Sequence, residues 1–134
     1  MKFPDKLDVL TVHARLIAET GGSGGLRDEG MLESALAAVE NRYRYEQADA
    51  VACAATYAFH LTQAHAFIDG NKRVGAAITE TFLVTNDFEL RLTDAEVVQL
   101  FLDIASSQLS RDQVEETLRE TVIAKNSKSR KSQV

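Results

Sequence analysis

The segment from Asp49 to about Ala64 restricts the fold of this chain more than any other part of the sequence. It is rich in small residues, and wound as a helix it is apolar around most of its circumference. A helix with a single apolar stripe lies at the surface of a core, whereas a helix that is apolar on nearly all sides is buried. The segment therefore predicts a central helix with other elements packed around it.

The segments before and after it supply those elements. Their apolar residues recur at steps of three and four positions, which is typical of helices with one buried face. Capping residues and glycines mark where such helices begin and end. The first expected helix runs from Pro4 to Gly21, and the second begins at a cap at Asp28. A further helix runs from about Asn71 to about Asn86. Two more begin at capping boxes, one of Thr93 with Glu96 and one of Ser110 with Gln113, and the last helix carries Val114, Leu118 and Val122.

The predicted fold is thus all-α, a single compact bundle of about six helices. One short segment departs from the helical pattern: Asn41–Tyr45 alternates polar with aromatic residues. Alternation of this kind is a signal for a short strand or hairpin. We therefore expect a β-hairpin-like flap in an otherwise helical domain.

Composition excludes several classes of protein. With 134 residues, of which 45% are hydrophobic and 26% charged, the chain has the size and balance of one globular domain. A net charge of −5 disfavours binding to nucleic acid or to an anionic membrane. The apolar stretch Val51–Phe59 is too short to cross a bilayer, and Met1–Leu10 lacks the order of a signal peptide. We expect a cytoplasmic domain with a reduced thiol, Cys53.

The last ten residues, 125–134, differ in charge from the rest of the chain. They contain four cations and no acidic residue, and they offer no apolar face to bury: Lys125, Lys128, Arg130 and Lys131. We expect a disordered basic tail after a domain that comprises residues 1–124.

The chemistry is concentrated at residues 65–73, which read HAFIDGNKR. Gly70 allows a tight turn, and the amides of Asn71, Lys72 and Arg73 would be unpaired donors at the start of the next helix. The helix dipole and the two cationic side chains favour an anion at that point. The segment therefore predicts a phosphate site on an otherwise acidic protein.

Two further residues fit such a site. Asp69 would repel a phosphate unless a divalent cation lay between them, and Mg²⁺ is bound in this way by one or two carboxylates with substrate phosphates. His65 is the residue of the segment that accepts a proton near neutral pH. Plainer explanations exist for each of them: His65 as a satisfied polar residue, Asp69 as a helix cap, and Lys72 with Arg73 as a solvated face.

Other candidate features are less specific. His13 and His60 lie within helical stripes without a partner at ligand spacing, so we interpret both as structural. The glycines of GGSGG at residues 21–25 follow no strand and precede no glycine-lysine-serine, so a flexible turn is favoured over a phosphate cradle.

The segment His65-x-Phe-x-Asp-Gly-Asn-Lys-Arg73 resembles the signature of the Fic/Doc superfamily, and in particular of its Doc (death-on-curing) toxin branch. The resemblance extends over Gly21–Leu36 and the small-residue helix, and it covers roughly residues 7–122. It implies the Fic/Doc fold and transfer of a phosphate or a nucleoside monophosphate to a protein hydroxyl. The segment Asn41–Glu46 falls where the family has its target-docking flap, which implies Arg42, Tyr43, Arg44 and Tyr45 as contacts.

Roles for the motif residues follow from this resemblance. It implies that His65 is the base, that Asp69 binds Mg²⁺, that Gly70, Asn71 and Lys72 form the anion-binding turn, and that Arg73 clamps phosphate. Adenylylating Fic enzymes have a glycine where this chain has Lys72, and a second arginine where it has Ala76. Both departures are Doc-like and imply a kinase that uses ATP and Mg²⁺, with adenylylation as the alternative.

Partners are implied in the same way. The resemblance to Doc-type toxins implies that the target is a Ser or Thr of a translation factor such as elongation factor Tu. It also implies restraint by an antitoxin whose helical segment fills a groove. The chain contains no Ser/Thr-x-x-x-Glu-Gly-Asn inhibitory segment, which favours restraint by a separate chain. A catalytically silent binding module is the alternative from another class of function.

Overall fold

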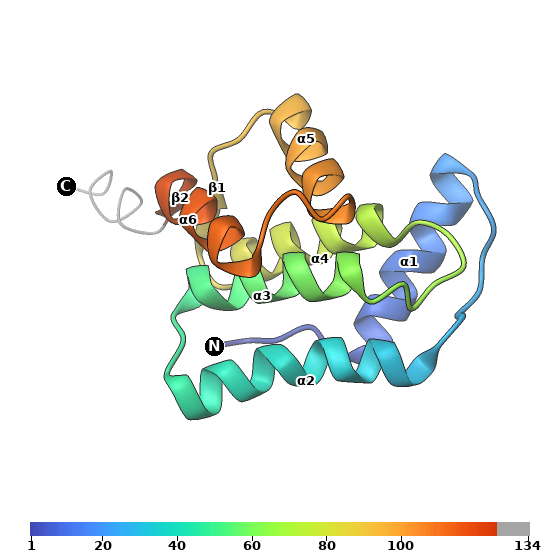
Figure 1. The fold of residues 1–134 in the computed structure, drawn as a ribbon, viewed down its shortest axis with the longest axis horizontal. Coiled ribbons are helices and arrows are strands. Elements are labelled where there is room, and N and C mark those ends of the chain that lie inside the picture. The colour runs from blue at the N-terminus through green and yellow to red at the C-terminus, as the bar shows by residue number, and fades with distance from the viewer. Residues whose placement is uncertain (126–134) are drawn as a thin grey trace, which may run out of the picture.

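A computed structural model describes residues 1–125 of the chain, and within them it has six helices and one small sheet (Figure 1). The predicted all-α bundle is confirmed. The basic tail predicted at residues 125–134 lies outside the described residues, except for Lys125. The elements are α1 (Lys6–Thr20), α2 (Glu29–Glu46), α3 (Ala50–Gln63), α4 (Asn71–Thr85), β1 (Phe88–Leu90), α5 (Asp94–Ala105), α6 (Arg111–Thr121) and β2 (Val122–Ala124).

Helix α3 lies at the centre of the molecule, as its composition predicts. It packs against α4, α6, α2 and α5, and α2 runs alongside it in Figure 1. Ten of its residues are buried, half of them alanine, and small side chains allow neighbouring helices to approach closely. Cys53 is wholly buried there, and burial raises the pKa of its thiol to about 11, so the thiol stays protonated at neutral pH.

The helix starts agree with the capping signals. Asp28 and Asp49 accept hydrogen bonds from the amides three residues further on, and both predicted capping boxes are formed, at the starts of α5 and α6. Helix α1 is the exception, because its cap is Asp5 in a capping box with Asp8. Pro4 therefore precedes the helix instead of occupying its first turn.

The strand or hairpin predicted at Asn41–Tyr45 is wrong, because these residues form the last turns of α2. Ion pairs at four-residue spacing support the helix here: Arg44 with Glu40 at 2.7 Å and Arg42 with Glu46 at 3.4 Å. Such pairs stabilise a helix and are not available to a strand. The helix ends only at Gln47, whose φ of 52° is left-handed.

The small sheet lies elsewhere. Strands β1 and β2 pair antiparallel, with Phe88 opposite Ala124, Glu89 opposite Ile123 and Leu90 opposite Val122. Val122, which the helical pattern assigned to the last helix, therefore belongs to a strand. Three-residue strands contain too little alternation to be recognised in a sequence. The sheet attaches the end of the described chain to the connection between α4 and α5.

Within residues 1–125, none of the helices has the length and apolar content that a membrane crossing requires.

Candidate active site between α3 and α4

The predicted site residues come together in one pocket. The segment that joins α3 to α4 borders an open pocket of about 290 Å³, and the lining includes His65, Asp69, Gly70, Asn71, Lys72 and Arg73. Thr62 of α3 and Ala105 of α5 close its sides. The pocket thus combines a histidine, a carboxylate, two cations and the start of a helix.

The start of α4 presents backbone amides without a side-chain cap. Gly70 is its N-cap with a φ of 82°, a left-handed conformation that suits glycine, and no side chain caps the helix. The first hydrogen bond inside the helix runs from Val74 N to Gly70 O at 2.9 Å. The amides of the preceding first turn therefore have no partner within the helix, and the dipole adds positive potential beside Lys72, whose side chain is exposed.

Asn71 stabilises the loop through its side chain. Its Oδ1 accepts a hydrogen bond from Phe67 N at 3.1 Å, and its Nδ2 donates to Phe67 O at 3.0 Å. Both ends of the amide side chain are thereby bound to Phe67, which leaves the second Nδ2 hydrogen and the backbone N–H of Asn71 for an anion. Phe67 is buried, as expected for a residue that anchors the loop in the core.

His65 is exposed and has a φ of 50°, which is uncommon for a residue with a side chain. Its carbonyl accepts a hydrogen bond from Arg27 Nε at 2.7 Å, and the next carbonyl, of Ala66, accepts from the amides of Arg27 and Asp28 at 2.7 and 3.0 Å. These bonds come from the start of α2 and hold the loop in place. The imidazole itself is left at the mouth of the pocket.

Asp69 does not cap α4, because its side chain accepts no hydrogen bond from the amides of the first turn. Its Oδ1 accepts from Gly70 N at 2.8 Å and its Oδ2 from Ser23 N at 3.3 Å. Arg73 forms an ion pair with the same carboxylate at 3.6 Å. The carboxylate is thus oriented from three sides, and its side chain remains about half exposed towards the pocket.

Arg73 is held at the end of α1. Its Nη1 donates to Thr20 Oγ1 and, at 2.9 Å, to Gly21 O. Its ion pair with Asp69 occupies a further part of the guanidinium. In this conformation a phosphate would have to compete with these partners for Arg73, whereas Lys72 is available without rearrangement.

The pocket also has neighbours that the sequence pattern did not indicate. His13, interpreted as structural, approaches Asp69 O with its Nε2 at 2.7 Å and stacks on Phe67 at 3.8 Å between ring centroids. The glycine segment 21–25, interpreted as a turn, lies against Asp69 and Arg73. No spacing could reveal either contact, since His13 and Asp69 are 56 positions apart.

The remaining histidine, His60, lies outside the pocket. Its Nε2 is 3.3 Å from Arg111 Nη1 on α6. Burial, followed by the charges of Arg111 and Arg42, lowers the pKa of His60, which favours a neutral ring at pH 7. These contacts agree with its interpretation as a structural residue.

The residues implied as target contacts lie on α2 and do not line the pocket. Arg42 packs on the domain itself, because its Nη1 donates to Thr56 Oγ1 at 3.0 Å and pairs with Glu115 at 3.1 Å. Tyr43 packs edge-on against Phe3, while Tyr45 is 72% exposed. Their role in docking stays a prediction.

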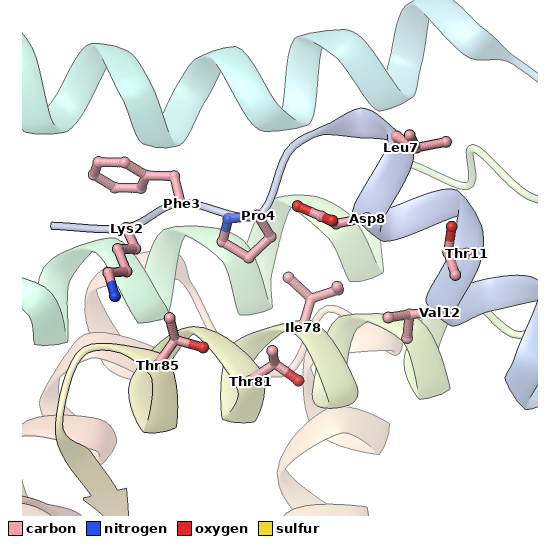
Figure 2. Close-up of a pocket in the computed structure, with 10 residues that line it drawn as sticks. All are labelled: Lys2, Phe3, Pro4, Leu7, Asp8, Thr11, Val12, Ile78, Thr81 and Thr85. Atoms are coloured by element: carbon pink, nitrogen blue, oxygen red, sulfur yellow. The ribbon is translucent and has the colours of Figure 1, made fainter.

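A larger pocket, of about 500 Å³, lies between the N-terminal segment, α1 and α4 (Figure 2). Its lining is apolar or hydroxylic apart from Lys2 and Asp8, as the labelled side chains show. It contains no histidine, and the helix start in its lining, that of α1, is capped by Asp5. The chemistry therefore points to the smaller pocket at the motif.

The donor set of the smaller pocket fits a magnesium–nucleotide. Across residues 1–125 no group of three or more His, Cys, Asp or Glu side chains could hold a metal ion by itself. Asp69 is the carboxylate in the pocket lining, and it faces a region of cations and free amides. A single carboxylate with substrate phosphates is a usual arrangement for Mg²⁺.

The comparisons with known proteins agree with this arrangement. The site is a loop between two packed helices, with a histidine at its start and an uncapped helix at its end. Residues 3–83, more than half of the chain and including the whole motif, match the model of the Fic/DOC family, and the chain belongs to that family. It is also similar to the protein kinase Doc of Escherichia phage P1, with 29% identity over 113 residues that cover 84% of this chain and 89% of the phage protein.

Proposed function

We propose that this protein is a Doc-like kinase toxin that transfers the γ-phosphate of ATP to a Ser or Thr hydroxyl of a target protein. The observation that carries the proposal is the convergence of His65, Asp69 and the uncapped start of α4 on one pocket. The likeness to a phage protein kinase over most of both chains supports a kinase over other transferases.

The chain's own residues suit each part of such a reaction. The hydroxyl oxygen of the target bonds to the γ-phosphorus, the bond from that phosphorus to the β–γ bridging oxygen breaks, and ADP leaves. His65 accepts the hydroxyl proton, which an exposed imidazole at the pocket mouth can do. Lys72 and the first amides of α4 hold the phosphates, which is the positioning and charge neutralisation that phosphoryl transfer needs. Mg²⁺, when bound at Asp69, would neutralise further phosphate charge.

Lys72 and Ala76 favour the kinase over the adenylyltransferase. A long cationic side chain stands where adenylylating relatives have a glycine, and Ala76 on α4 offers no second phosphate clamp. We infer that the γ-phosphate, and not the α-phosphate, occupies the reactive position beside His65.

Transfer of labelled phosphate tests this proposal. The protein is incubated with Mg²⁺, a candidate target such as elongation factor Tu, and ATP labelled at either the γ- or the α-phosphate. We expect label from the γ-position on the target and none from the α-position. Transfer of the α-label would instead identify an adenylyltransferase, and absence of both would favour a binding module.

A variant of the proposed base provides the control within the chain. His65→Ala should abolish transfer and leave the thermal unfolding midpoint nearly unchanged, since the ring is exposed and makes no side-chain hydrogen bond among the described residues. His60→Ala removes a histidine outside the pocket and should retain transfer. A His65→Ala protein that unfolds would show that His65 is a structural residue.

Expression in cells tests the toxin role. An active kinase of this type should arrest growth, and the His65→Ala variant should not. By the likeness to Doc, we expect an antitoxin with a helical segment that fills a groove and relieves the arrest when co-expressed. Growth that stops equally with both variants would argue for binding without catalysis.

A further inference from the structure

We propose that His13 of α1 is a positioning residue of the candidate site, which sets the orientation of the Asp69–Gly70 peptide and through it the Asp69 carboxylate. His13 lies on a different helix from the motif and is only 4% exposed. It is absent from the lining of the motif pocket, so its influence on a ligand is exerted through Asp69. This inference rests on the proposed function, because it concerns the same pocket.

The ring of His13 is hydrogen-bonded to the backbone of the motif loop. His13 Nε2 lies 2.7 Å from Asp69 O, and a carbonyl oxygen can only accept, so Nε2 must carry the hydrogen. The ring also stacks on Phe67, with an angle of 12° between the planes. A β-carbon added to Gly70 would lie 3.4 Å from His13 Nε2, so the contact leaves little space for the loop to shift.

The peptide bond between Asp69 and Gly70 connects the carbonyl beside His13 to the Asp69 side chain. Asp69 O and Gly70 N belong to one planar peptide unit, so a bond that orients the carbonyl also orients the N–H. Gly70 N donates to Asp69 Oδ1 at 2.8 Å. His13 is therefore linked to the carboxylate through two hydrogen bonds and one rigid plane.

The same peptide bond directly precedes the start of α4. Gly70 is the N-cap of this helix, and its φ of 82° depends on the orientation of the peptide that precedes it. A rotation of the Asp69–Gly70 peptide would change both the carboxylate that faces a cation and the amides that face an anion. Replacing the donor of His13 should thus weaken binding of a magnesium–nucleotide, and loss of such indirect ligand support typically costs about 10–100-fold in affinity.

Two substitutions separate positioning from packing. His13→Phe keeps a ring that can stack on Phe67 and removes the donor, whereas His13→Gln loses the ring and retains an N–H donor. His60→Phe serves as the matched control at a histidine outside the pocket. Affinity for Mg²⁺–ADP is measured by calorimetry, and unfolding midpoints are measured on the same samples.

We expect His13→Phe to weaken Mg²⁺–ADP binding about tenfold or more, His13→Gln to recover most of that loss, and His60→Phe to bind as the unmodified protein does. Equal affinity for His13→Phe and the unmodified protein would overturn the inference. An affinity lost with both His13 variants, in parallel with their unfolding midpoints, would show that His13 only packs.

A ligand-free measurement keeps this test independent of the proposed function. The ¹⁵N shifts of the His13 ring report which nitrogen carries the hydrogen, and Nε2–H is required. A ring with a bare Nε2 would overturn the inference even if no variant folded. If the affinities of the variants for Mg²⁺–ADP follow the expected order but the unmodified protein transfers no phosphate, the kinase proposal fails while the role of His13 stands.

Discussion

Gly21 and Gly22 are neighbours with left-handed φ angles of 86° and 113°, yet they differ in what surrounds them. A β-carbon on Gly22 would lie 2.5 Å from Asp69 Oδ2 and 3.1 Å from Arg73 Nη2, whereas one on Gly21 would meet nothing within 4 Å. At the scale of single residues, this pair allows the effect of backbone strain to be separated from the effect on the site.

We predict that Gly22→Ala weakens Mg²⁺–nucleotide binding and that Gly21→Ala does not. Both variants force a side chain into a conformation with positive φ, which costs about 1–3 kcal/mol of stability in each. Only at Gly22 must the Asp69 carboxylate or the Arg73 guanidinium move to make room. Calorimetry with Mg²⁺–ADP and thermal unfolding of both variants check this, and an equal loss of affinity in the two would contradict it.

The residues that sequence analysis found and those it missed differ in how they are connected. His65 to Arg73 lie in one short segment, so their shared pocket follows from local structure: a helix end, a glycine turn and a helix start. His13 and the glycine segment 21–25 contact Asp69 of this pocket from α1 and the loop that follows it. Such contacts depend on how α1 packs against the loop, and the pattern of one helix does not contain that information.

At the scale of elements, α3 and α4 approach each other closely at Gly75. A β-carbon there would overlap Thr62 Oγ1, which is buried and, among the described residues, has no hydrogen-bond partner. The contact allows α4, with the proposed anion-binding turn at its start, to lie against the central helix. It also defines a pair of positions whose substitutions should be coupled.

We predict that Gly75→Ala destabilises the fold by about 1–3 kcal/mol through overpacking, and that Thr62→Ala removes this penalty. In the Thr62→Ala background, alanine at 75 should be neutral or stabilising, because it favours a helix over glycine by up to about 1 kcal/mol. Thr62→Ser retains the hydroxyl oxygen and should leave the penalty in place. Denaturant unfolding of the single and double variants measures the coupling, and additive effects would contradict the packing described here.

Whether a helix or strand could be predicted depends on how many residues carry its sequence pattern. The six helices each combine several apolar repeats with a cap or a glycine, and these signals agree with one another. The segment Asn41–Tyr45 offered only five residues of alternation, and the ion pairs of Arg42 and Arg44 with glutamates four positions away favour the helix that is observed. The strands β1 and β2 depend on a pairing between distant segments, which neither segment indicates alone.

At the scale of the whole molecule, the acidic charge and the proposed anion site are compatible because the positive potential is local. The net charge of −5 argues against a long polyanion as a partner. Lys72 and the free amides of α4 nevertheless act over the few ångströms that a nucleotide's phosphates occupy, within the screening length of physiological salt. Net charge thus limits the class of ligand and does not determine the site.

The sheet predicts where the folded domain ends. The pairing of β1 with β2 extends to Ala124, and Lys125 N donates to Asp87 O at 2.8 Å. We expect a chain of residues 1–125 to unfold at nearly the same temperature as the full chain and to bind Mg²⁺–ADP equally well. A chain of residues 1–121 loses β2 and the half-buried Val122, and a loss of about 1 kcal/mol would lower its midpoint by roughly 4 °C in a domain of this size. Differential scanning calorimetry of the three chains measures this order. A midpoint or a nucleotide affinity that already falls with residues 126–134 removed would show that the basic tail belongs to the domain, because that truncation keeps every contact among residues 1–125.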